Sequence, residues 1–497
     1  MSRELYEKIL AGEEVRANLI ALKEKLRDEK ERKKFAYLLG GDFTALSSLL
    51  QAEDPKVRRN AALILGQMES EDLLPLLFDA YEREQTLFVR ADYLKAMARM
   101  NYRAYVGRME ERLLELRCRE VTMEEQKHVS EEMRMLQALI LKYRKGSHHK
   151  FVGQRVNTEL ILVVNRAQRE ATARQIKRGT VKLLAGGVRV KDGRVKDILP
   201  IRTWSELLFP LETDTLSAAD PSGVGYAVAD AMVQRLRELH EGEDAFLFRI
   251  ELKGKMDPEK KGAYIRRISD AVEQASQGAL INSVAEYEVE LRLLERKDGT
   301  YAAMLKLYTI PEKRFAYRRD VIASSIAPVN AALTAELAKP WMKEKAQVLD
   351  PFCGVGTMLI ERNQAVPAGT MYGIDIFGTA IDRARANTDR AGCSIYYINK
   401  DFFEFEHAYR FDEVITDLPQ VTSGKPREEI RQLYEHFFEK IPEHLKEEAV
   451  LILYTTEPQL AENALRIRKG YHVEKRFLMN EKSGTSVFVI CWKEGDV

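Results

Sequence analysis

A strand that runs into a double-glycine turn and then into a helix constrains this chain more than any other feature. The stretch is VLDPFCGVGTMLIE, residues 348–361, in which an apolar run ends at Asp350. Gly354 and Gly356 let the backbone approach a ligand closely and adopt dihedral angles that a side chain disfavours. Free amides at the start of the next helix favour anionic or carboxylate groups. The pattern predicts an α/β domain with a ligand site beside this turn.

Acidic residues follow the next predicted strands as well. Alone, any of these acids would be read as a helix N-cap. At consecutive strand ends they instead meet at the carboxyl edge of the sheet, where open α/β sheets bind ligands. Leu359 stands where a dinucleotide-binding motif has its third glycine, so S-adenosylmethionine fits this turn better than NAD. The strands and the residues that follow them are 371–374 with Asp375, 395–399 with Asp401 and Phe402, and 411–416 with Asp417.

These motifs carry a family resemblance. DPFCGVGT at 350–357, YGIDI at 372–376 and TDLP at 416–419 resemble class I methyltransferases associated with RNA-binding THUMP domains, which make N2-methylguanosine in tRNA or rRNA. The upstream runs 314–319 and 324–332 resemble that family too. The resemblance implies a Rossmann-like class I methyltransferase domain over residues 325–497, with S-adenosylmethionine as its cofactor. The cofactor-binding residues it implies are Asp350, Phe352, Gly354, Gly356, Asp375, Asp401 and Phe402.

The stretch ITDLPQ at 415–420 is the predicted catalytic segment. An exocyclic guanine amine is a poor nucleophile, and acceptors that hold its N–H groups near the methyl donor would align it for transfer. Asp417 and the carbonyl of Leu418 are the predicted acceptors, and Pro419 restricts the backbone of Leu418. Methyl transfer to a pyrimidine carbon would need a cysteine nucleophile, and this segment contains none.

Gln420 departs from the family pattern, which has an aromatic residue at this position. An aromatic ring there would stack on the target base, a contact worth about 1–3 kcal/mol in single-stranded nucleic-acid binding. Two hypotheses follow. The chain is an RNA methyltransferase acting on an exocyclic base amine, with N2 of guanosine in tRNA or rRNA as the preferred target. Alternatively, it is a non-catalytic, methyltransferase-like scaffold that binds RNA.

Residues 1–145 are expected to be helical throughout. A short phrase begins at Val15, Val57 and Val89, and each copy precedes an apolar helical face. Repetition at 42 and 32 residues is typical of an α-solenoid. The run DPKVRRNAALILG at 54–66 resembles HEAT repeats, whereas a plain helical bundle is the alternative. A solenoid would offer a docking surface for RNA or for a protein partner.

The middle region, residues 146–324, is predicted to be a basic α+β, THUMP-like RNA-binding region. Residues 142–196 contain fifteen Lys and Arg against three acids, a local charge of +12, which is more than solubility needs. Phosphate binding is the favoured explanation. At 313–319, aromatic rings alternate with basic residues in a way that suits stacked bases. The candidate RNA-binding residues are Arg166, Arg174, Lys177, Arg178, Arg314, Tyr317 and Arg318.

Composition sets the remaining expectations. A chain of 497 residues is too long to fold around one compact core, so two to four domains are expected. No uncharged run approaches the roughly 20 residues of a membrane span, and the charged N-terminus does not resemble a secretory signal. Four isolated cysteines show no metal-ligand spacing. We therefore expect a cytoplasmic protein that binds RNA, without a metal or a membrane partner.

Overall fold

The computed structural model describes residues 2–118, 121–122, 124–143, 149–242, 244–322 and 325–494. The chain forms two compact units. Unit 1 comprises residues 1–150, 212–237 and 241–302, and unit 2 comprises residues 151–211, 238–240 and 303–497. The predicted middle region is therefore divided between the two units. Residues 146 and 324, at the predicted domain boundaries, lie outside the described part.

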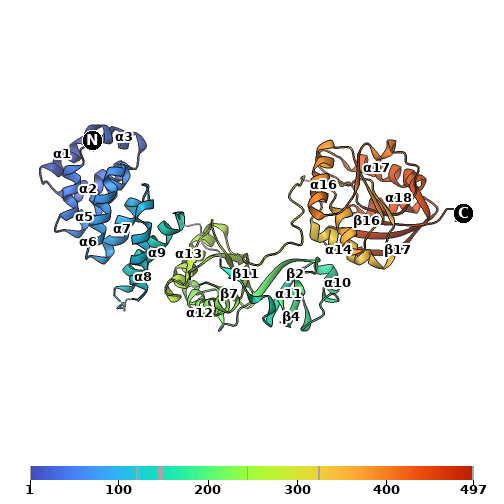
Figure 1. Cartoon of the computed structure of the whole chain (residues 1–497), viewed down its shortest axis with the longest axis horizontal. Helices are drawn as coiled ribbons and strands as arrows, with labels where there is room; N and C mark the ends of the chain where they lie inside the picture. Colours follow the sequence, from blue (N-terminus) through green and yellow to red (C-terminus); the bar gives the residue numbers. More distant parts are fainter. Residues whose placement is uncertain are drawn as a thin grey trace. The chain divides into compact units, whose positions relative to one another are not determined.

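The N-terminal part of unit 1 is helical, as predicted (Figure 1). The three copies of the repeated phrase start at or near the beginnings of α2, α5 and α7, and α2 packs on α5, which packs on α7. Apolar residues that follow each phrase, such as Leu19, Ile64 and Leu94, are buried in one shared core. The helices are α1 (Ser2–Leu10), α2 (Val15–Lys25), α3 (Glu29–Leu39), α4 (Thr44–Ser48), α5 (Pro55–Met68), α6 (Leu74–Arg83), α7 (Leu87–Met97), α8 (Val106–Cys118) and α9 (Gln126–Tyr143).

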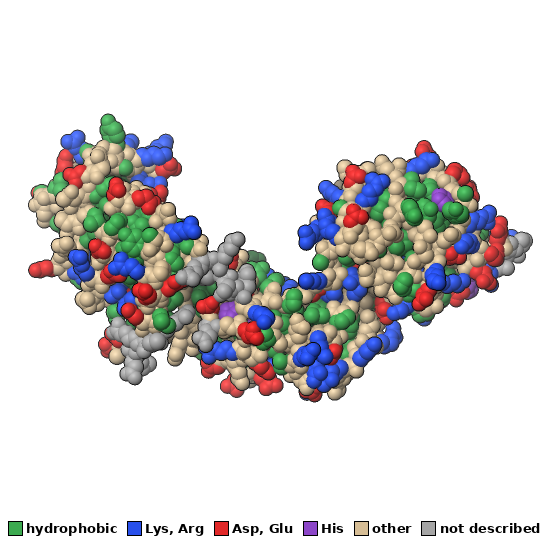
Figure 2. All heavy atoms as spheres, in the orientation of Figure 1, with side chains coloured by type: hydrophobic (Ala, Val, Ile, Leu, Met, Phe, Trp, Pro, Cys, Tyr) green, Lys and Arg blue, Asp and Glu red, His purple; other side chains and the backbone are tan. Residues whose placement is uncertain are grey.

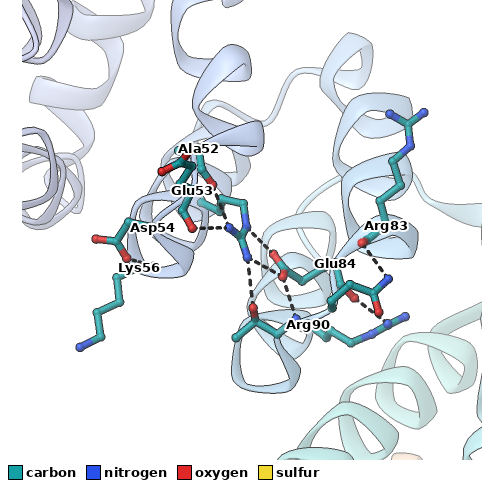
Figure 3. Close-up of polar contacts among 10 residues, drawn as sticks. Ala52, Glu53, Asp54, Lys56, Arg83, Glu84 and Arg90 are labelled. Carbon is teal, nitrogen blue, oxygen red and sulfur yellow. Dashed lines mark hydrogen bonds and ion pairs between the residues drawn. The ribbon is translucent and has the colours of Figure 1, made fainter.

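Two arginines of the repeated phrase, in its second and third copies, have structural partners (Figure 3). Arg58 donates from Nε and Nη2 to the two carboxylate oxygens of Glu84, both at 2.8 Å, and Arg90 donates to the Glu84 carbonyl at 2.8 Å. Asp54 caps α5 by accepting from the Lys56 amide. Because Glu84 is buried, its paired charge joins α5 to the segment between α6 and α7.

The rest of unit 1 combines helices with short strands. Strand β8 pairs in parallel with β9 and with β10, while β6 pairs with the first residues of β11. A Cβ on Gly225 would lie 2.5 Å from Cβ of Ala271, so this glycine permits the close contact of α12 with α13. The elements are β6 (Leu216–Ser217), α12 (Pro221–Leu239), β8 (Phe246–Lys253), α13 (Pro258–Ala275), β9 (Leu280–Asn282), β10 (Val289–Glu295) and β11 (Thr300–Leu307).

Residues 151–211 of unit 2 form antiparallel strands in the order β3-β4-β2-β5, and the last residues of β11 pair with β5. This part is joined to the C-terminal part of the same unit. Asn165 and Gln168 donate to the carbonyls of Met479 and Leu478 at 2.9 and 2.8 Å. The elements are β2 (Thr158–Val164), α10 (Arg169–Ala173), β3 (Thr180–Leu184), β4 (Gly187–Gly193), α11 (Val195–Ile198) and β5 (Trp204–Pro210). The short strands β1 (Lys150–Phe151) and β7 (His240–Glu241) pair with each other.

The C-terminal part of unit 2 is a seven-stranded sheet in the order β14-β13-β12-β15-β16-β18-β17. Its first five strands are parallel, and β18 and β17 form an antiparallel hairpin at one edge, where the sequence predicts a hairpin from the turn at Ser483 and Gly484. The strands are β12 (Gln347–Asp350), β13 (Thr370–Asp375), β14 (Tyr396–Asn399), β15 (Phe411–Asp417), β16 (Leu445–Thr455), β17 (Tyr471–Leu478) and β18 (Ser486–Trp492).

Helices cover both faces of this sheet (Figure 1). Successive residues of a strand point to opposite faces, so Leu349 and Val414 pack with α17 and α18, while Val348 and Ile415 pack with α14, α15 and α16. The predicted α/β fold of the C-terminal domain is confirmed. The helices are α14 (Pro328–Ala338), α15 (Thr357–Ala365), α16 (Gly378–Ala391), α17 (Arg427–Lys440) and α18 (Pro458–Arg466). Within the described residues, no helix combines the length and apolar character that crossing a bilayer requires.

Candidate active site

The glycine turn connects β12 to α15. Gly354 and Gly356 have φ of +52° and +81°, in the region that favours glycine. A Cβ on Gly356 would lie 2.1 Å from the hydroxyl oxygen of Tyr397, whereas a Cβ on Gly354 would meet no atom within 4 Å. Gly356 is therefore packed against β14, and Gly354 faces open space. That open space fits a ligand lying against the turn.

The four acids at the strand ends line one cavity of about 520 Å³ beside the glycine turn. It also contains Phe352, Phe402 and Gly354, together with the catalytic segment. Among the described residues, no cluster of His, Cys, Asp or Glu side chains could hold a metal ion. The lining residues used below are Asp350, Phe352, Gly354, Thr357, Asp375, Asp401, Phe402, Asp417, Leu418, Pro419, Gln420, Thr422 and Lys425.

Asp375 and Asp401 support local backbone while their carboxylates border the cavity. Asp375 accepts from the amide of Gly354 and from the amide of Phe377, both at 2.9 Å, which ties the tip of β13 to the glycine turn. Asp401 accepts from the Phe403 amide at 3.0 Å and caps a short 3-10 helix. A carboxylate has about four acceptor positions, so these bonds leave capacity for a ligand.

Asp350 is fully buried at the base of the cavity. Its Oδ1 accepts from the Thr416 hydroxyl at 2.6 Å and from the Phe352 amide at 3.1 Å, whereas its Oδ2 has no partner among the described residues. Burial raises the pKa of Asp350 to about 8. The hydroxyl of Thr357 is also buried without a partner in the described part of the chain. Two unpartnered buried polar groups beside the glycine turn fit a ligand that carries hydrogen-bonding groups.

Hydrogen bonds from β16 and α17 fix the predicted catalytic segment. The amide of Leu418 donates to the carbonyl of Tyr454 at 2.9 Å, which continues the pairing of β15 with β16. The hydroxyl of Tyr434, a buried residue of α17, donates to the carbonyl of Pro419 at 3.0 Å. Burial raises the pKa of Asp417 to about 7. The carboxyl group of Asp417 can therefore gain and lose a proton near neutral pH.

Gln420 is exposed at the rim of the cavity, where its Oε1 accepts from the hydroxyl of Thr456 at 3.4 Å. Sequence reasoning missed Tyr397, Tyr434 and Lys425, which support or border the site. A tyrosine in a strand or helix carries no sequence signal for such a contact, because the contact joins elements far apart in the chain. Lys425 could have been noticed from its position eight residues after Asp417.

The structure corrects two of the predicted RNA contacts. The ring of Tyr317 is buried, and its hydroxyl donates to Glu361 at 2.6 Å. The guanidinium of Arg314 lies 3.1 Å from the ring centre of Trp204, and its side chain is only 6% exposed. Both side chains have partners inside the protein, so we no longer propose them as RNA contacts. Arg318 donates to the carbonyl of Ile326 at 2.9 Å.

The alternating aromatic and basic residues at 313–319 instead join two parts of unit 2. Arg202, just before β5, makes a bidentate pair with Glu361 of α15, with both N–O distances at 2.7 Å. The guanidinium of Arg202 also lies 4.8 Å from the ring centre of Phe315. Glu361 is fully buried and accepts from Tyr317 as well. This network fixes the antiparallel strands of unit 2 to the helix that follows the glycine turn.

The four remaining arginine and lysine candidates in residues 151–211 are exposed. One lies in the short 3-10 helix before α10 and three lie between α10 and β3, and in the described part of the chain none of them forms an ion pair. Lys and Arg side chains gather on the surface around β4, in the same part of unit 2 (Figure 2). The residues are Arg166, Arg174, Lys177 and Arg178.

A parallel sheet with a glycine turn after its central strand and acids at neighbouring strand ends defines a class I methyltransferase fold. Residues 317–486 match the family described as the RMKL-like methyltransferase domain, and residues 43–116 match HEAT repeats. The C-terminal part of this chain is thus similar to RMKL-like methyltransferase domains, and its cofactor is S-adenosylmethionine. No curated protein matches the sequence.

Solved structures resemble this chain over about two thirds of its length. TrmN from Thermus thermophilus is 19% identical, covers 67% of this chain and 99% of its own, and has a TM-score of 0.52. A "possible methylase" from Clostridium difficile 630 is 15% identical, covers 68% and 98%, and has a TM-score of 0.51. SMU.472 in complex with SAH is 13% identical, covers 69% and 99%, and has a TM-score of 0.50. At these identities the similarity shows the fold.

Proposed function

We propose that this chain is an RNA methyltransferase that acts on an exocyclic base amine, with N2 of guanosine in cytoplasmic tRNA or rRNA as the preferred target. The observation that carries the proposal is that Asp417, Leu418 and Pro419 line the same cavity as the glycine turn. A methyl donor held by the turn and an amine held by Asp417 would be neighbours. Proximity of this kind supplies a large part of the acceleration in group-transfer reactions.

S-adenosylmethionine supplies an electrophilic methyl group on a sulfonium sulfur. The residues proposed to hold it are Gly354 and Gly356 in the turn with Asp350, Asp375 for the ribose hydroxyls, and Asp401 for the adenine amine, with Phe352 and Phe402 in the cavity wall. Asp417 would accept one N–H of the target amine, and the carbonyl of Leu418 would accept the second. The methyl–sulfur bond would break as the carbon–nitrogen bond forms, leaving a neutral thioether, and the proton leaving the amine would pass to the carboxylate of Asp417.

The proposed RNA contacts are Arg166, Arg174, Lys177 and Arg178, with Arg318 as a further candidate. The first four are exposed and free of ion pairs in the described residues, which leaves their charges available to phosphates. The helical repeats of unit 1 would add a docking surface for RNA or for a protein partner.

The second candidate is a non-catalytic scaffold that binds RNA, and Gln420 is the observation that favours it. Calorimetry of S-adenosylmethionine binding, with Asp375→Ala as the control, separates the two functions. The proposal expects binding by the wild type and weakened binding by the variant. A wild-type protein that binds no cofactor would support the scaffold.

The reaction itself is tested with radiolabelled methyl groups and bulk RNA. Asp417→Ala should retain cofactor binding and lose transfer by a factor of about 10² or more, because the amine is no longer held. Retained transfer would show that another group holds the amine. Mass spectrometry of the methylated nucleosides then identifies the base, and a product other than N2-methylguanosine would correct the proposed target.

A further inference from the structure

The segment after Pro419 folds into a tight turn at the mouth of the cavity. The amide of Thr422 donates to the carbonyl of Lys425 at 3.0 Å, and the amide of Lys425 donates back to the carbonyl of Thr422 at 3.2 Å. These two bonds fix the backbone of Lys425 beside the catalytic segment. Its half-buried side chain lines the cavity that also contains Asp417.

Lys425 is the only lysine or arginine among the described residues that line this cavity, which also contains four carboxyl groups. In the described part of the chain Lys425 forms no ion pair, so its charge is not already matched by a neighbouring acid. A phosphate that approaches such an acidic cavity is repelled by every ionised carboxylate. A polyanionic substrate therefore needs a local cation where its phosphate passes the rim.

Lys425 follows the strand beside which the methyl acceptor is proposed to bind, and not the strands proposed to bind the adenosine. The proposed ribose and adenine residues follow β13 and β14, at one edge of the sheet order. Lys425 follows β15, on the opposite side of β12, eight residues after Asp417. A group bound by Lys425 would thus lie near the amine held by Asp417.

We propose that Lys425 binds the phosphate of the target nucleotide and so makes this acidic cavity selective for a base within a nucleic-acid chain. This inference rests on the proposed function. An ammonium group is a compact cation that attracts a phosphate without the bidentate geometry that arginine offers. The turn formed by Thr422 and Lys425 would hold that charge at a fixed distance from the catalytic carboxylate.

The test compares Lys425→Gln, Lys425→Arg and Lys482→Gln in the full-length protein. Lys482 lies in the exposed turn between β17 and β18, away from the cavity, and serves as the control. For Lys425→Gln we expect the KM for RNA to rise about 10-fold. The slope of log KM against log salt should become shallower by about one, because one phosphate contact is lost. Lys425→Arg should restore most of the affinity, and Lys482→Gln should behave as the wild type.

Calorimetry with S-adenosylmethionine completes the experiment. The inference expects equal cofactor affinity in the wild type and in Lys425→Gln. A variant that loses cofactor affinity while its KM for RNA is unchanged would overturn it, because Lys425 would then serve the cofactor's carboxylate. An unchanged KM and an unchanged salt slope in Lys425→Gln would overturn this inference and leave the proposed function standing. A wild type that binds cofactor but methylates no RNA would overturn the proposed function, and this inference with it.

Discussion

The hydroxyl of Tyr434 donates a hydrogen bond to the carbonyl oxygen of Pro419 across 3.0 Å. The same hydroxyl lies 2.8 Å from the hydroxyl oxygen of Thr455, which accepts from the amide of Glu457. Tyr434 is fully buried in α17, so these bonds connect the predicted catalytic segment to the helix that follows it in the chain. The carbonyl of Pro419 is occupied by this bond, which leaves the carbonyl of Leu418 as the proposed second acceptor.

Tyr434→Phe should lower kcat about 10-fold or more while leaving the affinity for cofactor unchanged. The change removes the bond that fixes the backbone after Asp417, and small misplacements of a reacting group cost large factors in rate. Removing the hydroxyl breaks its bonds to Pro419 and to Thr455, which should reduce the free energy of unfolding by about 1–3 kcal/mol. Single-turnover methyl transfer and thermal melting measure the two effects. A variant with wild-type kcat would show that Tyr434 does not position the segment.

The rate of methyl transfer should rise with pH through about 7. Burial raises the pKa of Asp417 to about 7, and only its ionised form accepts the proton of the amine. Below that pKa the rate should fall about tenfold per pH unit, and above it the rate should level off. A pH profile of kcat from 5.5 to 8.5 at saturating cofactor measures this. Asp417→Asn should be slow at every pH. A flat wild-type profile would contradict the role of Asp417.

Alanine substitutions at the two glycines of the turn should weaken cofactor binding for different reasons. Gly356→Ala would place a Cβ against Tyr397 at a φ of +81°, so it should lower the melting temperature and weaken cofactor binding. The new Cβ of Gly354→Ala would meet no atom within 4 Å, so this substitution should cost only about 1–2 kcal/mol of backbone strain. It should nevertheless weaken cofactor binding, because the Cβ fills part of the proposed site. Thermal melting and calorimetry separate the two.

The control for this pair is Tyr397→Phe combined with Gly356→Ala. Removing the hydroxyl takes away the nearest atom, 2.1 Å from the new Cβ, and leaves the next at 3.1 Å. The double variant should therefore recover part of the stability that Gly356→Ala loses. No recovery would mean that backbone strain, and not the contact with Tyr397, makes glycine necessary.

Arg202→Ala should destabilise unit 2 by about 3 kcal/mol, because it leaves the buried carboxylate of Glu361 without its charged partner. Arg189 and Glu159 form a pair with the same bidentate distances of 2.7 Å but with more exposure, so Arg189→Ala should cost at most about 1 kcal/mol. All three tryptophans lie in unit 2, so urea unfolding followed by their fluorescence reports on this unit. Equal losses in the two variants would contradict the difference in burial.

The C-terminal fold could be predicted from the sequence because its determinants are local. The strand, the double glycine and the following helix occupy one continuous stretch, and β13, β14 and β15 lie within two residues of the predicted strands. The terminal hairpin was also visible from its turn at Ser483 and Gly484. The sequence predicts a helix over residues 264–277, whereas α13 begins six residues earlier, at Pro258, since Asp257 caps it and Pro258 suits its first turn.

The run at 313–319 shows where sequence reasoning fails. Its alternation of aromatic and basic residues suited a nucleic-acid groove, and the same residue types also suit a buried network of ion pairs and stacked rings. The guanidinium of Arg314 stacks on Trp204, and the hydroxyl of Tyr317 donates to Glu361; both partners are distant in the chain. Only the packing of the antiparallel strands against α15 distinguishes the two uses. Among the described residues, no ion pair engages the basic candidates Arg166, Arg174, Lys177 and Arg178.

The sequence by itself determined that an α/β methyltransferase domain follows a helical repeat region, because glycine conformation, strand-end acids and helical periodicity act over short stretches of chain. Tertiary structure alone decided which side chains face the cavity and which are paired with other side chains inside the protein. Three features depend on elements that meet only when the chain is folded. They are the Asp350 oxygen that has no partner among the described residues, the bond from Tyr434 to Pro419, and the cation of Lys425 at the rim.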